Sequence, residues 1–328
     1  MSIKTTDFLA LTDDLQEITN EVMIDKVAEM STADMIFDIK DMVRRTYDLQ
    51  VVHGTKGIEY VPDGSDYPRA SSEEGDSITF TQGAYGVIVP ITKQMRMFDL
   101  YDQITGLATS VTEEGMDKID QSFADMLLKG FAATAYTDVY NKTVTPVGPD
   151  GNALFYATHS NGATGETYSN IITEGATVNP VMSRSAIVAE RIRGLVYKNV
   201  NDLTTPIRLD TLIVPPSLED AAERYLFSTQ IPGEANNDIN ALKGKIKTLK
   251  IWERLESSSD GTDTSAYWFM ADSSKVKNTM KAIFAQRPML SAPDQVFSNK
   301  DWEYSFDYLY TRGFGWSPYL RGSNSTEA

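Results

Sequence analysis

The stretch YDQITGLATSVTEEGMDKIDQSFADMLLKGFAATA, residues 101–135, carries the longest helical pattern in the sequence. Its apolar residues recur at steps of three, four or five, which places them in one stripe along a helix. At about 1.5 Å per residue the striped part would be roughly 40 Å long, so other elements must pack along it. We therefore predict a long spine helix over about 101–135 that organises the fold. The stripe comprises Ile104, Leu107, Ala108, Val111, Met116, Ile119, Phe123, Met126, Leu127 and Phe131.

The opposite side of this segment is polar and predicts a face that stays in solvent. Gly106 and Gly115 interrupt the segment, and each weakens a helix by about 1 kcal/mol relative to alanine. The apolar stripe keeps its phase across both glycines, so we expect one continuous helix. The expected solvent face carries Asp102, Glu113, Glu114, Asp117, Lys118, Asp120 and Asp125.

The overall composition is that of an ordinary globular protein. With 328 residues, 41% hydrophobic and 23% charged, the chain should form one large domain or two of medium size. It contains no apolar run of about eighteen residues, and its start MSIKTTDF lacks a basic and then apolar segment, so neither a membrane span nor a signal peptide is predicted. The absence of cysteine excludes disulfides and thiolate sites, and it agrees with a reducing cell interior.

The net charge of −16, from 46 acidic and 30 basic residues, bears on the partners. A surface of this sign repels a polyanion, which argues against a protein that reads DNA sequence. It agrees with a protein that stays soluble and lies near nucleic acid without binding it tightly.

The first 45 residues predict an acidic arm of one or two helices. Leu11, Leu15, Ile18 and Val22 keep helical spacing and form a single narrow stripe. A terminal segment with one stripe and no core of its own must dock on something. That partner could belong to another copy of the chain.

Residues 46–85 change to strand and turn patterns. Short strand runs near 47–52 and 57–61 precede the polar, turn-rich stretch 62–76, and another run near 77–81 follows it. This order predicts a long two-stranded hairpin with a solvated tip. A lone hairpin is at best marginally stable in water, so one this long needs support from a neighbour.

The rest of the chain divides into a polar region, an inserted α/β unit and a closing strand. From residue 181 helix and strand patterns alternate, beginning with a helix whose expected apolar stripe is Val188, Ile192, Leu195 and Val196. The segment 302–316 alternates aromatic and polar residues, which predicts a strand. Because it lies after the α/β unit, we expect it to pair with the strand near Val87 and to pack on the spine helix.

No residue pattern predicts catalysis, a cofactor or a metal. The sequence has two histidines, His53 and His159, and neither lies in a nucleophile motif such as Gly-x-Ser-x-Gly. The acidic residues Glu73, Glu74 and Asp76 lie in a Ser/Gly-rich loop and are typical of a solvated surface. An arm and a long hairpin would instead leave apolar surface and strand edges uncovered in an isolated copy, so we predict an assembling protein.

Four local stretches carry a resemblance to a known family: VPITKQM (89–95), DGNALFYATHSN (150–161), LIVPPSLEDAA (212–222) and YWFMAD (267–272). They are similar to stretches of Mu-like phage head proteins, and the order of elements resembles major capsid proteins of tailed bacteriophages of the Hong Kong 97 type. The resemblance implies an α+β fold with an N-terminal arm, an extended β-hairpin loop, a peripheral domain with the spine helix, and an inserted α/β axial domain.

Mapped on this chain, the resemblance implies four regions. They are the arm at 1–45, the extended loop at 46–85, the peripheral domain at 86–180 and 297–328, and the axial domain at 181–296. Lys56 is the only lysine of the loop and lies near its base, so a covalent cross-link between subunits is not supported. Candidate intersubunit contacts are Glu59, Tyr60, Tyr67, Arg69, Glu73 and Glu74 in the loop and Leu15, Ile18 and Val22 in the arm.

The resemblance also implies function and partners. It implies a structural subunit, assembled in the host bacterial cytoplasm into hexamers and pentamers of an icosahedral virion capsid that encloses double-stranded DNA. A separate scaffold protein, a portal and a decoration protein are the implied partners, with no membrane and no cofactor. Two alternatives stay open: a hydrolase with a site in the cleft between the two domains, and another phage structural protein such as a tail-tube subunit.

Overall fold

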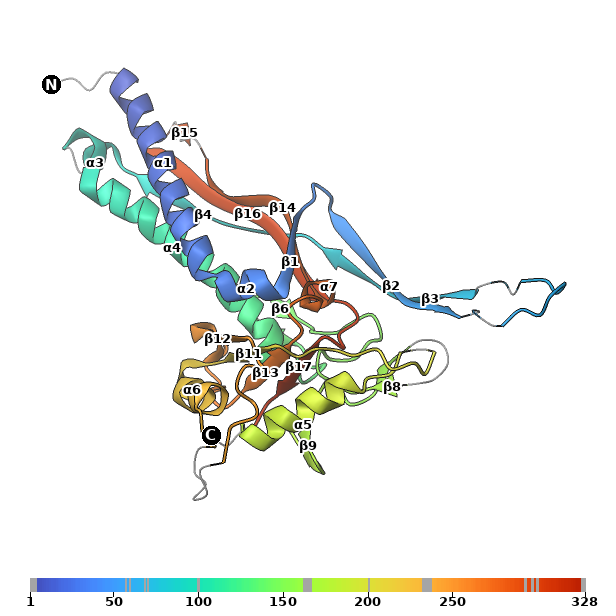
Figure 1. Cartoon of the computed structure of the whole chain (residues 1–328). Coiled ribbons are helices and arrows are strands. Elements are labelled where there is room, and N and C mark those ends of the chain that lie inside the picture. The colour runs from blue at the N-terminus through green and yellow to red at the C-terminus, as the bar shows by residue number, and fades with distance from the viewer. Residues whose placement is uncertain are drawn as a thin grey trace.

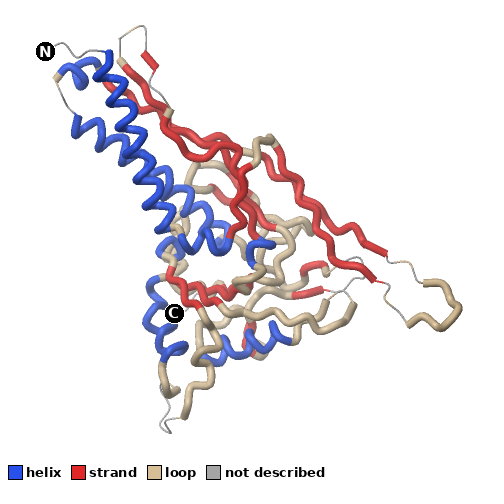
Figure 2. The backbone as a smooth tube through the Cα atoms, turned by 45° about the horizontal axis from the view of Figure 1, so that its top comes forward, coloured by secondary structure: helices blue, strands red, loops and turns tan. Residues whose placement is uncertain are grey.

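One long helix and two β-sheets form the frame of an elongated molecule, from which a β-hairpin projects (Figures 1 and 2). The computed structural model describes residues 5–56, 58, 60–67, 69, 71–98, 101–161, 167–199, 201–231, 238–291, 294–295, 298 and 301–325. Helices and strands together confirm the predicted α+β class. In this described part of the chain no helix has the length and apolar character needed to span a membrane.

The spine helix is α4, Tyr101–Leu128, which ends seven residues before the predicted Ala135. It ends there because Gly130 turns the chain, and a side chain at that position would meet Met126 O at 2.7 Å and Leu154 Cβ at 2.9 Å. Most of the apolar stripe is buried as predicted, but Leu107 is 41% exposed, Val111 is half-buried, and the half-buried Phe131 lies beyond the end of the helix. Its buried members are Ile104, Ala108, Met116, Ile119, Phe123, Met126 and Leu127.

The apolar side of α4 packs on a sheet with β16 at its centre. The side chains of Tyr304, Phe306, Tyr308 and Tyr310 alternate along β16 and are all buried in the same core as the α4 stripe. The predicted pairing with the strand near Val87 is confirmed, because Phe306 lies opposite Val87 in the register of β16 and β4. The sheet runs in the order β1 (Phe37–Asp41), β14 (Met280–Leu290), β16 (Trp302–Phe314), β4 (Gly83–Ile91), and β15 (Asp294–Gln295) pairs with the start of β16.

The N-terminal segment packs on its own chain. Helix α1, Thr5–Glu29, lies along α4 in both views, and Lys26 Nζ lies 3.4 Å from Asp117 Oδ1 of α4 (Figures 1 and 2). After α2, Ser31–Ile36, the strand β1 pairs in parallel with β14. The predicted arm at 1–45 therefore needs correction, because its last part is a strand of the main sheet.

The inserted unit has its own sheet, whose order is β12, β11, β13, β17. Helices α5 and α6 share one apolar core with the side chains of Leu212, Val214, Trp268 and Met270, so both cover the same face of this sheet. The strands are β11 (Thr211–Val214), β12 (Thr248–Ile251), β13 (Trp268–Ala271) and β17 (Leu320–Ser323), and the helices are α5 (Arg184–Leu195) and α6 (Glu219–Phe227).

Two strands cross the predicted boundaries of the inserted unit. Strand β14 lies within the predicted axial range 181–296, yet it pairs with β1 and β16 of the main sheet. Strand β17 lies within the range 297–328 assigned to the peripheral domain, yet it pairs with β13. The chain thus exchanges a strand between its two sheets in each direction.

The polar side of α4 is a solvent face only in part, since Glu113 and Glu114 are exposed as predicted but the carboxylates further along are not, which corrects the prediction for them. Asp120 and Asp125 are buried, and burial raises the pKa of both carboxyls. Trp252 Nε1 donates to Asp120 Oδ1 at 3.2 Å, and the Ser259 backbone N–H donates to Asp125 Oδ1 at 3.1 Å. These partners belong to the inserted unit, so the polar side of α4 holds that unit.

Three further contacts extend this junction along α4. Arg254 Nη2 lies 2.7 Å from Asp117, Gln121 donates to the Ser257 carbonyl at 3.3 Å, and Lys129 Nζ lies 2.6 Å from Asp260. We call Asp117, Asp120, Gln121, Asp125 and Lys129 the junction column. The remaining elements are short: α3 (Lys93–Met97), α7 (Val276–Thr279), η1 (Pro216–Leu218), η2 (Glu253–Leu255), β5 (Tyr136–Thr137), β6 (Thr143–Val144), β7 (His159–Ser160), β8 (Thr167–Tyr168), β9 (Thr173–Glu174) and β10 (Thr177–Val178).

The two glycines of the spine helix should respond oppositely to alanine. A Cβ at Gly115 would lie 2.4 Å from Phe306 Cε1, whereas nothing lies within 4 Å of a Cβ at Gly106. Gly115→Ala should lower the free energy of unfolding by about 1–2 kcal/mol, because overpacking outweighs the gain in helix propensity. Gly106→Ala should raise it by up to about 1 kcal/mol. Urea unfolding checks both, and equal effects at the two positions would contradict the close packing of α4 on β16.

Ionised Asp125 should lower the free energy of unfolding by an amount that depends on pH, and asparagine at this position should remove that effect. Because its pKa is raised above 3.8, the charged form destabilises the fold above that pH, and the cost disappears once the carboxyl is protonated in both states. Asp125→Asn should therefore stabilise the protein at pH 7 by about 1 kcal/mol and lose this advantage below about pH 4. Asp125→Ala should destabilise it by about 1–3 kcal/mol, since Gln121 and the Ser259 N–H lose their acceptor. Urea unfolding across this pH range checks both variants. A difference in the free energy of unfolding between Asp125→Asn and the unmodified protein that does not change with pH would contradict the buried charge.

Candidate functional site

The projecting element is an antiparallel hairpin of β2, Thr46–Lys56, and β3, Ser71–Thr81. Its register pairs Thr46 with Thr81 at the base and Lys56 with Ser71 at the far end. Both views show it extending away from the two sheets (Figures 1 and 2). The hairpin predicted from the sequence is therefore present.

The base of the hairpin packs on two glycines, Gly313 near the end of β16 and Gly315 directly after it. A Cβ at Gly313 would lie 2.0 Å from Phe80 Cε1, and one at Gly315 would lie 2.7 Å from Leu49 Cδ2. Phe80 is 8% exposed, so its ring is held against the sheet. We call Gly313 and Gly315 the hairpin seat. The sequence did not lead us to predict this contact, although two glycines spaced by one residue inside an aromatic segment signal a close approach of another segment.

The tip of the hairpin exposes apolar and aromatic side chains. Ile58 is 104% exposed, Tyr60 89% and Tyr67 85%, so their own chain covers none of them. Arg69 is also exposed. Of the other predicted loop contacts, Glu73 and Glu74 are residues of β3, whereas Glu59 lies outside the described residues.

The arm residues behave differently from those of the hairpin. Leu15 is 1% exposed and belongs to the core that includes the α4 stripe, which corrects its assignment to a surface that meets another copy. The reason is that α1 docks on α4 of its own chain. Ile18 and Val22 are half-buried, so each keeps some surface for another contact.

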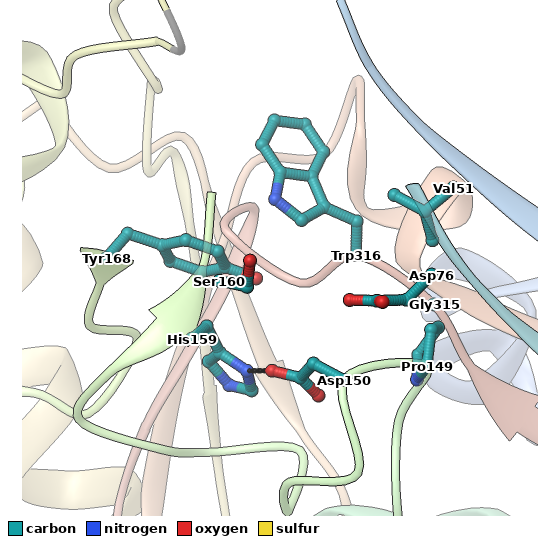
Figure 3. Close-up of a pocket in the computed structure, with 9 residues that line it drawn as sticks. All are labelled: Val51, Asp76, Pro149, Asp150, His159, Ser160, Tyr168, Gly315 and Trp316. Carbon is teal, nitrogen blue, oxygen red and sulfur yellow. Dashed lines mark hydrogen bonds and ion pairs between the residues drawn. The ribbon is translucent and has the colours of Figure 1, made fainter. Parts of the chain in front are cut away.

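A small pocket lies where the hairpin base meets the body, and it holds His159 (Figure 3). His159 Nδ1 lies 2.7 Å from Asp150 Oδ2, and Nε2 lies 3.2 Å from the Leu154 carbonyl. Val51 and Asp76 of the hairpin line the side of the pocket away from Tyr168. Burial acts to raise the pKa of Asp150, but hydrogen bonds with His159 and Asn152 outweigh it and lower this pKa to about 2.

This geometry does not support the hydrolase alternative. A general base needs a ring nitrogen that faces the nucleophile, and in His159 one nitrogen faces Asp150 and the other a backbone carbonyl. Within the described residues no group of three or more His, Asp or Glu side chains could hold a metal ion. The pocket is a structural joint between the hairpin and the body.

Comparison with known families decides the class of protein. A family model described as phage capsid protein matches residues 75–317, which include β4, α4, most of the main sheet and most of the inserted unit. The chain belongs to the phage capsid protein family. It is a structural protein rather than an enzyme, and it is a capsid subunit rather than a tail-tube subunit.

Solved capsids share the fold of this phage capsid protein. The mature capsid of bacteriophage PhiM1 aligns with a TM-score of 0.56 at 10% identity, over 90% of this chain and 87% of that chain. The capsid of an empty GTA particle aligns with a TM-score of 0.53 at 11% identity, over 91% and 90%. At such low identity these similarities show the fold alone. No protein with a curated description matches the sequence significantly.

Substitution of the hairpin seat should loosen the hairpin without unfolding the body. Gly313→Ala places a methyl group against the Phe80 ring, so the free energy of unfolding should fall by about 1–3 kcal/mol. Backbone amides of 46–51 and 76–81 should exchange faster with solvent, while those of α4 keep their protection. Hydrogen exchange measures both.

A smaller side chain opposite the seat provides the control. Phe80→Leu combined with Gly313→Ala should regain part of the lost stability, because the shorter side chain leaves room for the methyl group. Additive losses in the double variant would contradict a direct contact between these two positions.

Proposed function

We propose that this phage capsid protein is the major capsid subunit of a tailed-phage head and self-assembles into a closed icosahedral shell around double-stranded DNA. The observation that carries the proposal is the family match over 75–317 in a chain with a projecting hairpin. The arrangement of a hairpin, a spine helix with its sheet, and an inserted α/β unit supports assignment to the Hong Kong 97 type, with Mu-like head subunits as relatives.

The proposed mechanism of assembly is mechanical. Each hairpin reaches over an adjacent subunit, so that Ile58, Tyr60 and Tyr67 are buried against it rather than in their own chain. Each contact is modest, but copies arranged as hexamers and pentamers repeat it many times, and closure of the shell makes the contacts mutually reinforcing. Arg69, Glu59, Glu73 and Glu74 in the hairpin and Ile18 and Val22 in α1 are the further proposed contacts.

The charge of the subunit agrees with a container for DNA. A net charge of −16 disfavours tight binding of the packaged polyanion. The same charge makes copies repel one another, so assembly should strengthen as salt screens that repulsion over a Debye length of about 8 Å near physiological ionic strength.

The remaining partners follow from the same proposal. A separate scaffold protein guides the curvature of the shell, a portal occupies one vertex, and a decoration protein binds the outside. Assembly takes place in the host bacterial cytoplasm, and the product is the virion capsid. Each of these partners needs a surface to bind, and an assembled shell repeats the surfaces of one subunit many times.

Purification of the protein alone tests the proposal most directly. Negative-stain microscopy with light scattering should show shells, hexamers or pentamers over a range of protein and salt concentrations. A monomer under all of these conditions, with and without co-expressed scaffold, would refute the proposed assembly.

The exposed tyrosines of the hairpin tip should matter for assembly and not for folding. Tyr60→Ser with Tyr67→Ser should leave the melting temperature unchanged, because both side chains are exposed in the isolated subunit. The protein concentration needed for shell formation should rise about tenfold or more, which corresponds to about 1.4 kcal/mol per subunit. Val43→Ser, which removes an 88% exposed side chain from outside the hairpin, is the control and should assemble normally. Normal assembly of the tip variant would contradict the role of the hairpin.

A further inference from the structure

Helix α5 presents an apolar row to solvent rather than to its own core. Ile192 is 54% exposed and Val196, one turn further, is 60% exposed. Both belong to the stripe predicted from the sequence to face the core, so that prediction is wrong for these two residues, whereas Val188 of the same stripe packs against the core. The side that packs on the sheet consists of Ala186, Ile187, Glu190 and Gly194.

The inner side of α5 is fixed, so the helix cannot turn its apolar row inward. The buried Glu190 carboxylate accepts a hydrogen bond from buried Arg321 of β17 and another from Arg193 Nη2 at 2.9 Å. A Cβ at Gly194 would lie 2.8 Å from the Ile207 carbonyl, which shows how closely the helix lies to the chain beneath it. Rotation of α5 would leave a charge buried without its partner, which is strongly destabilising.

The chain after α5 extends this apolar row. Leu203 is 63% exposed and lies in a turn in which Asn199 Oδ1 accepts from the Leu203 N–H at 3.0 Å, and the Thr205 N–H donates to the Tyr197 carbonyl. These bonds fold the turn back against the end of α5. We call Ile192, Val196 and Leu203, together with the half-buried Arg191 that directly precedes Ile192, the α5 patch. Arg191 makes no ion pair within the described part of the chain.

Helix α6 carries an outward row of complementary character. Glu219, Glu223 and Phe227 follow one another at intervals of four residues, so they lie on one side of the helix. Both glutamates are exposed, Phe227 is 51% exposed, and among the described residues neither glutamate has an ion-pair partner. The inner side of α6 is occupied by Ala222 and Leu226. We call these three residues the α6 row.

We propose that the α5 patch of one copy packs against the α6 row of the next copy around a ring of subunits. Arg191 pairs with Glu219 and Glu223, and Phe227 packs on Ile192, Val196 and Leu203. The inference deepens the proposed capsid function by naming the two surfaces through which inserted units meet.

The partner is a second copy because one copy cannot make this contact with itself. The apolar members of both surfaces are more than half exposed, so the two do not cover each other within one chain. Figure 1 shows α6 beside β12 and α5 beneath β13 and β17 on the same inserted unit. A contact between two different surfaces of one unit is head-to-tail, and its repetition closes into a ring when the rotation permits.

Charge selects this contact over the symmetric alternatives. Two α5 patches facing each other would bring two arginines together, and two α6 rows would bring four carboxylates together. Like charges directly opposed at an interface disfavour such pairings, whereas the head-to-tail contact places one arginine opposite two carboxylates. The apolar members then supply area that water leaves on association.

A cross-link between two single-cysteine variants tests the contact. The chain has no cysteine of its own, so each introduced thiol is unique. Full-length Ile192→Cys and Phe227→Cys proteins, distinguished by a tag on one of them, are mixed, assembled and treated with a short bis-maleimide. We expect a covalent dimer that contains one chain of each kind. Val43→Cys replaces Phe227→Cys in the control and should give no mixed dimer.

Each outcome separates the inference from the proposed function. Dimers formed by Ile192→Cys or by Phe227→Cys alone would replace the head-to-tail contact by a symmetric one and overturn the inference. Shells without the mixed dimer would overturn the inference and leave the capsid function intact. Failure of the unmodified protein to assemble would overturn both.

Charge reversal gives an independent readout. Arg191→Glu and Glu223→Arg should each raise the concentration needed for assembly about tenfold without changing the melting temperature, since both residues lack ion-pair partners in the described part of the subunit. The double variant should recover most of that loss. Absence of recovery would contradict a direct pairing of these residues.

Discussion

The structure depends on the way in which one helix binds two different neighbours with its two sides. The apolar side of α4 packs on β16, closely enough that Gly115 has no room for a side chain. The polar side carries the junction column, in which Asp120 and Asp125 are buried against residues of the inserted unit. The raised pKa values of both carboxyls record the energetic cost of this arrangement, which hydrogen bonds and Arg254 only partly offset.

This frame explains why the chain can offer uncovered surfaces to other copies. Two strands are exchanged between the sheets, since β14 serves the main sheet and β17 serves the inserted one. Together with the junction column these exchanges hold the body as a unit. The hairpin meets that body at its base, where Phe80 and Leu49 lie against Gly313 and Gly315. A body fixed in this way presents the exposed tip and the outer rows of α5 and α6 in defined positions, which repeated contacts between copies require.

The sequence predicted the elements with strong local periodicity and missed those set by distant partners. The stripe of α4 and the alternation in β16 are visible because each element repeats its own pattern. The burial of Asp120 depends on Trp252, which lies 132 positions later, and no local pattern signals it. In α5 the stripe was right for Val188 but wrong for Ile192 and Val196, because Arg321 neutralises Glu190 and allows a glutamate to occupy the core. The hairpin tip was predictable from its turn-rich composition, whereas its seat on β16 required contacts between β3 and β16 that only the fold reveals.

The surfaces proposed for assembly must bind copies of a strongly charged subunit to one another. Copies that each carry a net charge of −16 repel one another at a distance, so only close contacts between opposite charges and apolar groups can bind them. Each proposed contact therefore has to form against this repulsion. Each contact alone is therefore reversible, and a misplaced subunit can dissociate. Closure of a ring and then of a shell makes every subunit depend on several such contacts at once, which converts weak individual binding into a stable container.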